Sequence, residues 1–401
     1  MTTSPAHVAP DAGASTLARE LTPAVGAAAQ IVRRNIARFA DEYPDDTTHH
    51  NRYPLRPASG PFPEGANRDW TTGFVPGQQW LAWQLTGDEQ FRAAAARHAL
   101  DFERRQRAGE DLDTHDLGFL YTLACVAPWR LTGDQDARAA ALAAADHLMG
   151  RFLEPAGIIQ AWGDLDDPEQ RGRTIIDSLM NMPLLSWAFE QTGEQRYADA
   201  VRRHTAQLAE HIVRADDSTF HTFHWDPVTG QPLRGTTAQG AGDDSCWARG
   251  QAWGIYGFAL NFQATGSQEL LVAAERCADY FLAHLPADHV AFWDLDFTDG
   301  DGQPRDSSAA AIAACGLHEL ARVEPDGARA DAYAGAGVQI LRALGPGYTP
   351  AAEGVDSDAL LLHAVYSLPA GWGIDEGCLW GDYFYLEALA RHTLADWKRY
   401  W

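Results

Sequence analysis

The feature that most constrains the fold is a short turn that recurs between two kinds of helical segment. A Thr-Gly pair followed by a polar residue stands at 86–88, 132–134, 192–194 and 265–267. Glycine suits the left-handed conformation that ends a helix, and the Asp, Glu or Ser that follows suits the start of the next one. The chain is therefore predicted to consist of repeated helix pairs.

The two helices of each predicted pair differ in polarity. Segments after the turns, such as 89–105, carry apolar residues at three-and-four spacing with charges between them, which indicates outer helices. Segments before the turns, such as 246–264, are apolar, small or aromatic nearly all round, which indicates buried inner helices. With the segments listed next, the count is six inner and six outer helices in alternation. These segments are 17–41 and 327–344 (outer) and 307–323 and 378–397 (inner).

Repeated helix pairs that bury a common inner layer predict an all-α fold, an (α/α)6 barrel, formed by residues 17–401 as a single catalytic domain. Residues 1–16 are small and polar, and we expect a disordered tail there. The connections that enter the inner helices are long, so the functional site is expected on their face of the barrel. These connections are 42–69, 154–173, 214–243 and 286–306, and the third contains a predicted β-hairpin at 218–235.

Charge and cysteine content narrow the function classes. The formal net charge is −24 and Lys398 is the only lysine, which argues against a nucleic-acid or anionic-membrane partner. The five cysteines are scattered without a CxxC pair, as expected for free thiols in a reducing compartment. The sequence shows no secretory leader pattern and no run of 18 apolar residues. We therefore expect a cytoplasmic protein, either a monomer or a weak homodimer.

Acidic or polar residues begin every predicted inner helix, and the simplest interpretation of each one is an N-cap. Asp116 and Asp177 fit that role less well. Asp116 leads directly into LGFLYTLACVAPW, and Asp177 lies inside IIDSLMNMPLL. Apolar surroundings favour the protonated form of a carboxyl group, which a general acid needs near neutral pH.

The same face carries residues suited to an anionic sugar. Indole rings can stack on a sugar and a guanidinium can bind a carboxylate through two hydrogen bonds, although core packing is an equally good explanation for each tryptophan. The candidates are Trp70, Trp162, Trp247 and Trp253 for stacking, Arg249 for the carboxylate, and His115, His221 and Gln239 for hydrogen bonds. His221 and His224 lack a nearby acidic or Cys residue to complete a metal site, so no metal and no cofactor are predicted.

Four ordered motifs then identify a family resemblance. RDWTTGFVPGQQWLAW, HDLGFLYTLACVAPW, TIIDSLMNMPLLSWA and GDDSCWARGQAWGIYGF, within residues 67–258, together resemble the unsaturated glucuronyl hydrolases, glycoside hydrolase family 88. The resemblance implies release of a 4,5-unsaturated glucuronic acid from the non-reducing end of oligosaccharides made by polysaccharide lyases. It implies that Asp177 is the proton donor and water activator and that Asp116 is the second essential carboxylate. It also implies a sugar subsite lined by Trp70, His221, Gln239, Trp247, Arg249 and Trp253.

The implied chemistry is hydration of a vinyl ether. The acid protonates C4 of the double bond, its conjugate base activates the water that adds at C5, and the hemiketal then opens and expels the second sugar. The late segment PAGWGIDEGCLWGD lacks the Ser and Lys residues of members that prefer sulfated substrates and carries Asp375 and Glu376. Repulsion of sulfate by these carboxylates predicts a preference for non-sulfated substrates.

Three alternatives remain open at this point. The related unsaturated rhamnogalacturonyl hydrolases share the barrel and the chemistry and act on pectin fragments. A sugar epimerase on the same barrel would be expected to use histidine bases. A non-catalytic sugar-binding barrel would keep the aromatic residues without turnover.

Overall fold

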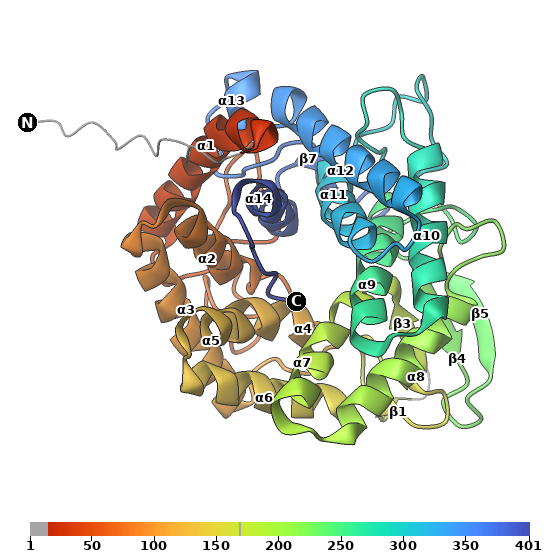
Figure 1. Cartoon of the computed structure of the whole chain (residues 1–401). Helices are drawn as coiled ribbons and strands as arrows, with labels where there is room; N and C mark the ends of the chain where they lie inside the picture. Colours follow the sequence, from red (N-terminus) through yellow and green to blue (C-terminus); the bar gives the residue numbers. More distant parts are fainter. Residues whose placement is uncertain (1–14, 168–169) are drawn as a thin grey trace, which may run out of the picture.

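The computed structural model describes residues 15–167 and 170–401. Helices form two concentric rings around a central axis, as predicted (Figure 1). The outer ring consists of α1 (Thr16–Phe39), α3 (Glu89–Ala108), α6 (Gln135–Met149), α8 (Gln195–His211), α10 (Gln268–Ala283) and α12 (Gly327–Gly347). The predicted tail at 1–16 falls almost wholly outside the described residues; Ser15 caps α1, which begins at Thr16.

Within residues 15–167 and 170–401 the inner ring has six members, of which two are irregular. Four are continuous helices: α2 (Phe74–Thr86), α9 (Ala248–Thr265), α11 (Ser307–Ala321) and α14 (Leu379–Thr393). The second member is α4 (Leu117–Tyr121), a π-helical turn (Thr122–Val126) and α5 (Ala127–Thr132). The third is a 3-10 turn (Ile176–Met180) followed by α7 (Met182–Thr192). These two irregular members carry the HDLGF and IIDSL motifs.

The Thr-Gly turns end the inner helices in the predicted way. Gly87, Gly133, Gly193 and Gly266 all have φ between 69° and 76°, the left-handed conformation that only glycine adopts without strain. At each turn the preceding threonine donates a hydrogen bond to the carbonyl four residues earlier. Four inner helices therefore end in the same Thr-Gly turn at one end of the barrel.

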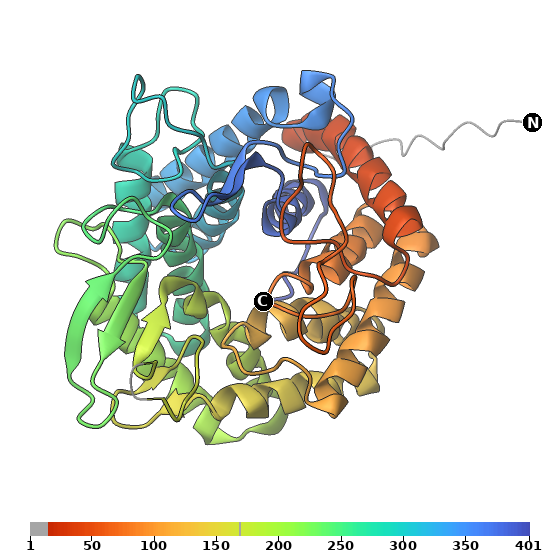
Figure 2. The ribbon, with the colours of Figure 1, turned by 180° about the vertical axis from the view of Figure 1, so that it is seen from behind.

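In the described part of the chain, three small antiparallel sheets lie on the opposite, long-loop face (Figure 2), and they add to the predicted all-α barrel. The predicted hairpin forms as β4 (Thr222–Trp225) and β5 (Pro232–Thr236), and β3 (Arg173–Ile175) adds a third strand to it. The other pairs are β1 (Phe152–Leu153) with β2 (Ile158–Ile159) and β6 (Ala364–Ser367) with β7 (Trp372–Glu376). The loop between α12 and α14, which carries α13 (Pro350–Glu353) and the β6–β7 hairpin, was not among the four long connections predicted, although residues 369–382 were expected to influence sulfate preference. No helix in the described part of the chain is long and apolar enough to cross a membrane.

Candidate active site

Asp116 and Asp177 meet beside His115 on the long-loop face. The Nε2 atom of His115 lies 3.3 Å from Oδ1 of Asp116 and 3.5 Å from Oδ1 of Asp177. The carboxyl side chains are 14% and 17% exposed, whereas His115 is buried. Two carboxyl groups thus share one partly enclosed space with an imidazole.

Neither carboxyl group is used as a helix cap. Asp116 is at the N-cap position of α4 but its side chain accepts no capping hydrogen bond; its Oδ2 accepts one from the hydroxyl of Thr114 instead. Asp177 lies within the 3-10 turn, past its N-cap Ile175, and its Oδ1 has no hydrogen-bond partner. By contrast, Asp306 does cap α11 by accepting from the amides of Ser308 and Ala309.

Burial raises the pKa of Asp177 well above its ordinary value, and the neighbouring Asp116 raises it further, while Arg249 acts in the opposite direction. Burial also lowers the pKa of His115, although Asp116 opposes this. The lowered pKa of His115 favours an imidazole without positive charge, and the raised pKa of Asp177 favours the protonated form of its carboxyl group, which is the state a general acid requires.

Asn181 joins the two irregular inner elements. Its Oδ1 accepts from the amide of Phe119 at 2.9 Å, and its Nδ2 lies 3.4 Å from Oδ1 of Asp116. Gly118 permits this approach, because an added Cβ would lie 2.2 Å from the Cα of Asn181. Sequence reasoning missed Asn181, although a polar residue inside IIDSLMNMPLL was a usable signal.

A buried network fixes the turn that carries Asp177. The hydroxyl of Ser178 donates to the carbonyl of Ile175 at 2.6 Å and lies 2.8 Å from Nε2 of His204 on α8. Nδ1 of His204 accepts from the amide of Ile159, so Nε2 carries the proton and donates to Ser178. Burial lowers the pKa of His204 to about 3, which keeps this arrangement neutral.

The predicted polar residues of the sugar subsite lie next to one another. Nε2 of His221 is 3.4 Å from Nε2 of Gln239, and the rings of His221 and Trp247 are 4.9 Å apart. Burial lowers the pKa of His221 to about 3, so this imidazole is neutral. Oε1 of Gln239 accepts from the guanidinium of Arg249 at 2.5 Å.

The guanidinium of Arg249 already has several hydrogen-bond partners within the protein. Besides Gln239, it donates to Asp306 at 3.2 Å and to the carbonyls of Val365 and Tyr366 at 2.5 and 2.7 Å. It is 1% exposed, so a two-point grip on a substrate carboxylate would require these bonds to break. The structure favours a positioning role in which Arg249 ties α9, α11 and the β6–β7 hairpin together.

The four candidate tryptophans differ in exposure. Trp162 is 47% exposed, with the guanidinium of Arg173 3.7 Å from its ring centre, and it follows Ala161, whose carbonyl accepts from the amide of His115. Trp70 is partly buried, and its Nε1 donates to the hydroxyl of Tyr366 at 3.0 Å. Trp247 is 4% and Trp253 only 1% exposed. Trp253 packs between Phe119 and Phe384, so core packing explains its position better than sugar stacking.

His115, Asp116 and Asp177 are also the one group in the described part of the chain whose His, Cys and acidic ligand atoms lie close enough to hold a metal ion, within 4.8 Å of one another. A divalent cation there would need both carboxyl groups ionised, which burial of Asp177 opposes. In contrast, His221 and His224 contact the hydroxyls of Thr222 and Thr236.

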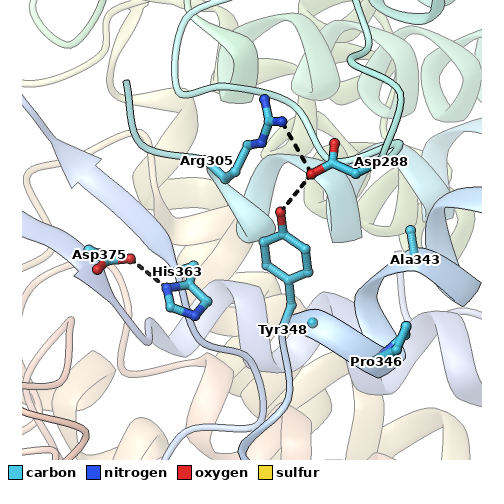
Figure 3. A pocket seen from close by; sticks show the side chains of 8 residues that line it. Asp288, Arg305, Ala343, Pro346, Tyr348, His363 and Asp375 are labelled. Atoms are coloured by element: carbon cyan, nitrogen blue, oxygen red, sulfur yellow. Dashed lines mark hydrogen bonds and ion pairs between the residues drawn. The ribbon is translucent and has the colours of Figure 1, made fainter. Parts of the chain in front are cut away.

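A separate cavity of about 550 Å³ lies at the base of the β6–β7 hairpin (Figure 3). There Nδ1 and Nε2 of His363 lie 2.5 and 2.7 Å from Asp375 and Glu353, while Arg305 pairs with Asp288. Glu376 accepts from the hydroxyl of Thr48 and the amides of His50 and Asn51. Both carboxylates expected to repel sulfate are therefore held by local partners.

Known proteins share the sequence and the fold of this chain over most of its length. Residues 35–318 match the model of Glycosyl Hydrolase Family 88. The chain is 44% identical to an unsaturated chondroitin disaccharide hydrolase of Streptococcus agalactiae over 95% of its length and 93% of the relative. It is also 44% identical to an unsaturated glucuronyl hydrolase of Bacillus sp. GL1, covering 92% and 95% of the two chains. A crystal structure of unsaturated glucuronyl hydrolase from Streptococcus agalactiae superposes with a TM-score of 0.90 at 42% identity, covering both chains completely.

Proposed function

Because the chain belongs to Glycosyl Hydrolase Family 88, we propose that Asp177 and Asp116 carry out hydration of a 4,5-unsaturated uronic acid at the non-reducing end of an oligosaccharide. The chain is a glycosidase, and its substrates are the unsaturated disaccharides that polysaccharide lyases release. The observation that carries the residue assignment is the pair of carboxyl groups beside His115, where burial raises the pKa of Asp177.

Each residue of the pair has a distinct role in this proposal. Protonated Asp177 transfers its proton to C4 of the double bond, and positive charge develops at C5 and the ring oxygen. Ionised Asp116 stabilises that charge across the enclosed space, where electrostatic interactions are stronger than in water. Asp177, now a carboxylate, removes a proton from the water that adds at C5, and the resulting hemiketal opens to a keto acid and the free second sugar.

The surrounding residues bind and orient the substrate. His115, His221 and Gln239 offer hydrogen bonds, and Trp70, Trp162 and Trp247 offer ring faces. Arg249 holds Gln239 in place and contributes positive charge near the uronate carboxylate without binding it directly. The chemistry needs no metal or cofactor, and we propose that none takes part.

We retain the proposal that non-sulfated substrates are preferred, but on a different basis. Asp375 and Glu376 already have hydrogen-bonding partners, so their repulsion of sulfate is weakened. Residues 364–376 of the hairpin contain no Lys or Arg that could pair with a sulfate. The absence of a cation in this segment now supports the preference.

The expected setting is a cytoplasmic monomer or weak homodimer without a nucleic-acid or membrane partner. A net charge of −24 disfavours binding to polyanions. All five cysteines are free and buried, in keeping with a reducing compartment.

The direct test is incubation with a panel of lyase-generated unsaturated disaccharides, with and without sulfate and including one with rhamnose as the second sugar. Hydration predicts loss of the ultraviolet absorbance of the double bond, release of the second sugar, and, in D₂O, deuterium at C4 of the keto acid. Activity should survive removal of divalent cations with a chelator. Release of the second sugar with the absorbance retained would instead indicate attack at the anomeric carbon and would overturn the proposed mechanism.

A further inference from the structure

One exposed aromatic residue that was not predicted as a site residue lies close to the candidate site. Trp372, at the start of β7, is 63% exposed, a fraction that core packing does not explain. Its ring is 6.3 Å from that of Tyr366 on the paired strand β6. Figure 2 shows the β6–β7 hairpin, in dark blue, at the border of the central opening on the long-loop face.

From Trp372 a row of aromatic rings runs inward toward the core of the barrel. The ring of Tyr366 is 6.4 Å from that of Trp70, which is 5.6 Å from that of Phe119. Exposure falls along the row, from 63% at Trp372 to 0% at Phe119. Tyr366 links this row to the candidate site, because its hydroxyl accepts from Nε1 of Trp70 at 3.0 Å and its ring lies 5.8 Å from the guanidinium of Arg249. Trp372 therefore lies one ring outward from the sugar subsite.

The hairpin holds Trp372 on a rigid support. Gly373 packs closely on the loop at 42–69, and an added Cβ there would lie 2.5 Å from Cγ2 of Thr47. Glu376 binds Thr48, and the carbonyls of Val365 and Tyr366 accept from Arg249. The backbone that carries Trp372 is thus anchored on both strands and loses little conformational freedom when a ligand binds, which favours stacking.

We propose that Trp372 is the stacking platform for the sugar attached to the unsaturated uronic acid, and so determines how strongly the enzyme prefers disaccharides to simple glycosides. This proposal rests on the proposed function. The uronic acid occupies the enclosed inner end of the site, and the next sugar ring extends toward the solvent. An apolar sugar face placed on the exposed indole there is stabilised by dispersion and by release of water. Trp372 does not contact the reacting atoms.

The test compares two substrates, an unsaturated uronyl disaccharide and the methyl glycoside of the same unsaturated uronic acid. Wild-type protein is expected to prefer the disaccharide in kcat/KM. Trp372→Ala should lower kcat/KM for the disaccharide about tenfold, mainly through KM, the change that corresponds to about 1.4 kcal/mol of stacking. Turnover of the methyl glycoside should be unchanged, and Trp372→Phe should keep most of the preference.

Leu233→Ala is the matched control, because Leu233 is 61% exposed on the β5 strand of another hairpin. It should alter neither substrate. An equal effect of Trp372→Ala on both substrates, or no effect on either, would overturn the platform while leaving the proposed function intact. If the wild-type protein turned over neither substrate, the proposed function itself would be overturned.

Discussion

The close packing of Gly118 on Asn181 gives a quantitative test of how the barrel spaces its two carboxyl groups. In Gly118→Ala the new Cβ would lie 2.2 Å from the Cα of Asn181 and 2.6 Å from its backbone oxygen. Non-bonded heavy atoms are stable at about 3.5–4.0 Å, so α4 and the Asp177 turn must separate by about 1 Å or more. Overpacking of this kind costs about 1–3 kcal/mol of stability.

The larger expected effect is on catalysis. Asp116 precedes Gly118 by two residues and Asp177 precedes Asn181 by four, so the separation displaces one carboxyl group from the other. A displacement of about 1 Å at a reaction centre lowers the rate about 100-fold. The assay is kcat from loss of substrate absorbance, measured beside urea unfolding of the same variant.

Gly335→Ala is the control for this substitution. Gly335 lies within the outer helix α12, and a Cβ there meets no atom within 4 Å. Its substitution should raise helix stability by up to about 1 kcal/mol and leave kcat unchanged. If Gly118→Ala loses stability but keeps the wild-type kcat, the contact does not set the carboxyl spacing and the reasoning is wrong.

Three further predictions follow from the ionisable groups. Burial and the neighbouring Asp116 raise the pKa of Asp177, and the protonated form is active, so kcat/KM should fall as the pH rises through that raised pKa; a flat profile measured from weakly acidic to alkaline pH would exclude Asp177 as the acid. Arg249→Ala should cost about 3 kcal/mol of unfolding free energy in urea, because Asp306 would lose its buried cation; loss of substrate affinity at unchanged stability would restore Arg249 as a direct ligand. Burial opposes the charge of His363, but hydrogen bonds to Asp375 and Glu353 raise its pKa, so the stability that wild type has over His363→Asn should be full below about pH 6.5 and be lost as the pH rises through the raised pKa. The measurement is thermal unfolding of both proteins across this pH range. A stability difference between wild type and His363→Asn that grew as the pH rose would contradict the prediction.

The barrel could be predicted because its signals are local. Each Thr-Gly stop and each change from amphipathic to wholly apolar segment is visible within about 20 residues, and helix periodicity needs nothing more. The β4–β5 hairpin followed from a turn between aromatic residues. The strand β3 could not be predicted, because Arg173–Ile175 pairs with a strand nearly 50 residues away.

The candidate site was partly predictable for a similar reason. Asp116 and Asp177 stood out because a carboxyl group in an apolar segment is unusual in any sequence. The hydrogen bonds of Arg249 could not be predicted, since its partners Asp306, Val365 and Tyr366 are brought to it only by the fold. The burial of Trp253 could not be predicted either, because the rings of Phe119 and Phe384 that pack on it come from other inner helices.

The central claim is that Asp177 is the acid that protonates the double bond. The most direct test is Asp177→Asn, followed by loss of absorbance of an unsaturated disaccharide and by calorimetric binding of the same compound. Asp244→Asn, at an exposed aspartate before α9, is the control for an equal change of charge. We predict that Asp177→Asn binds the disaccharide without turning it over, whereas the control keeps the wild-type rate. Turnover by Asp177→Asn at the wild-type rate would contradict the account.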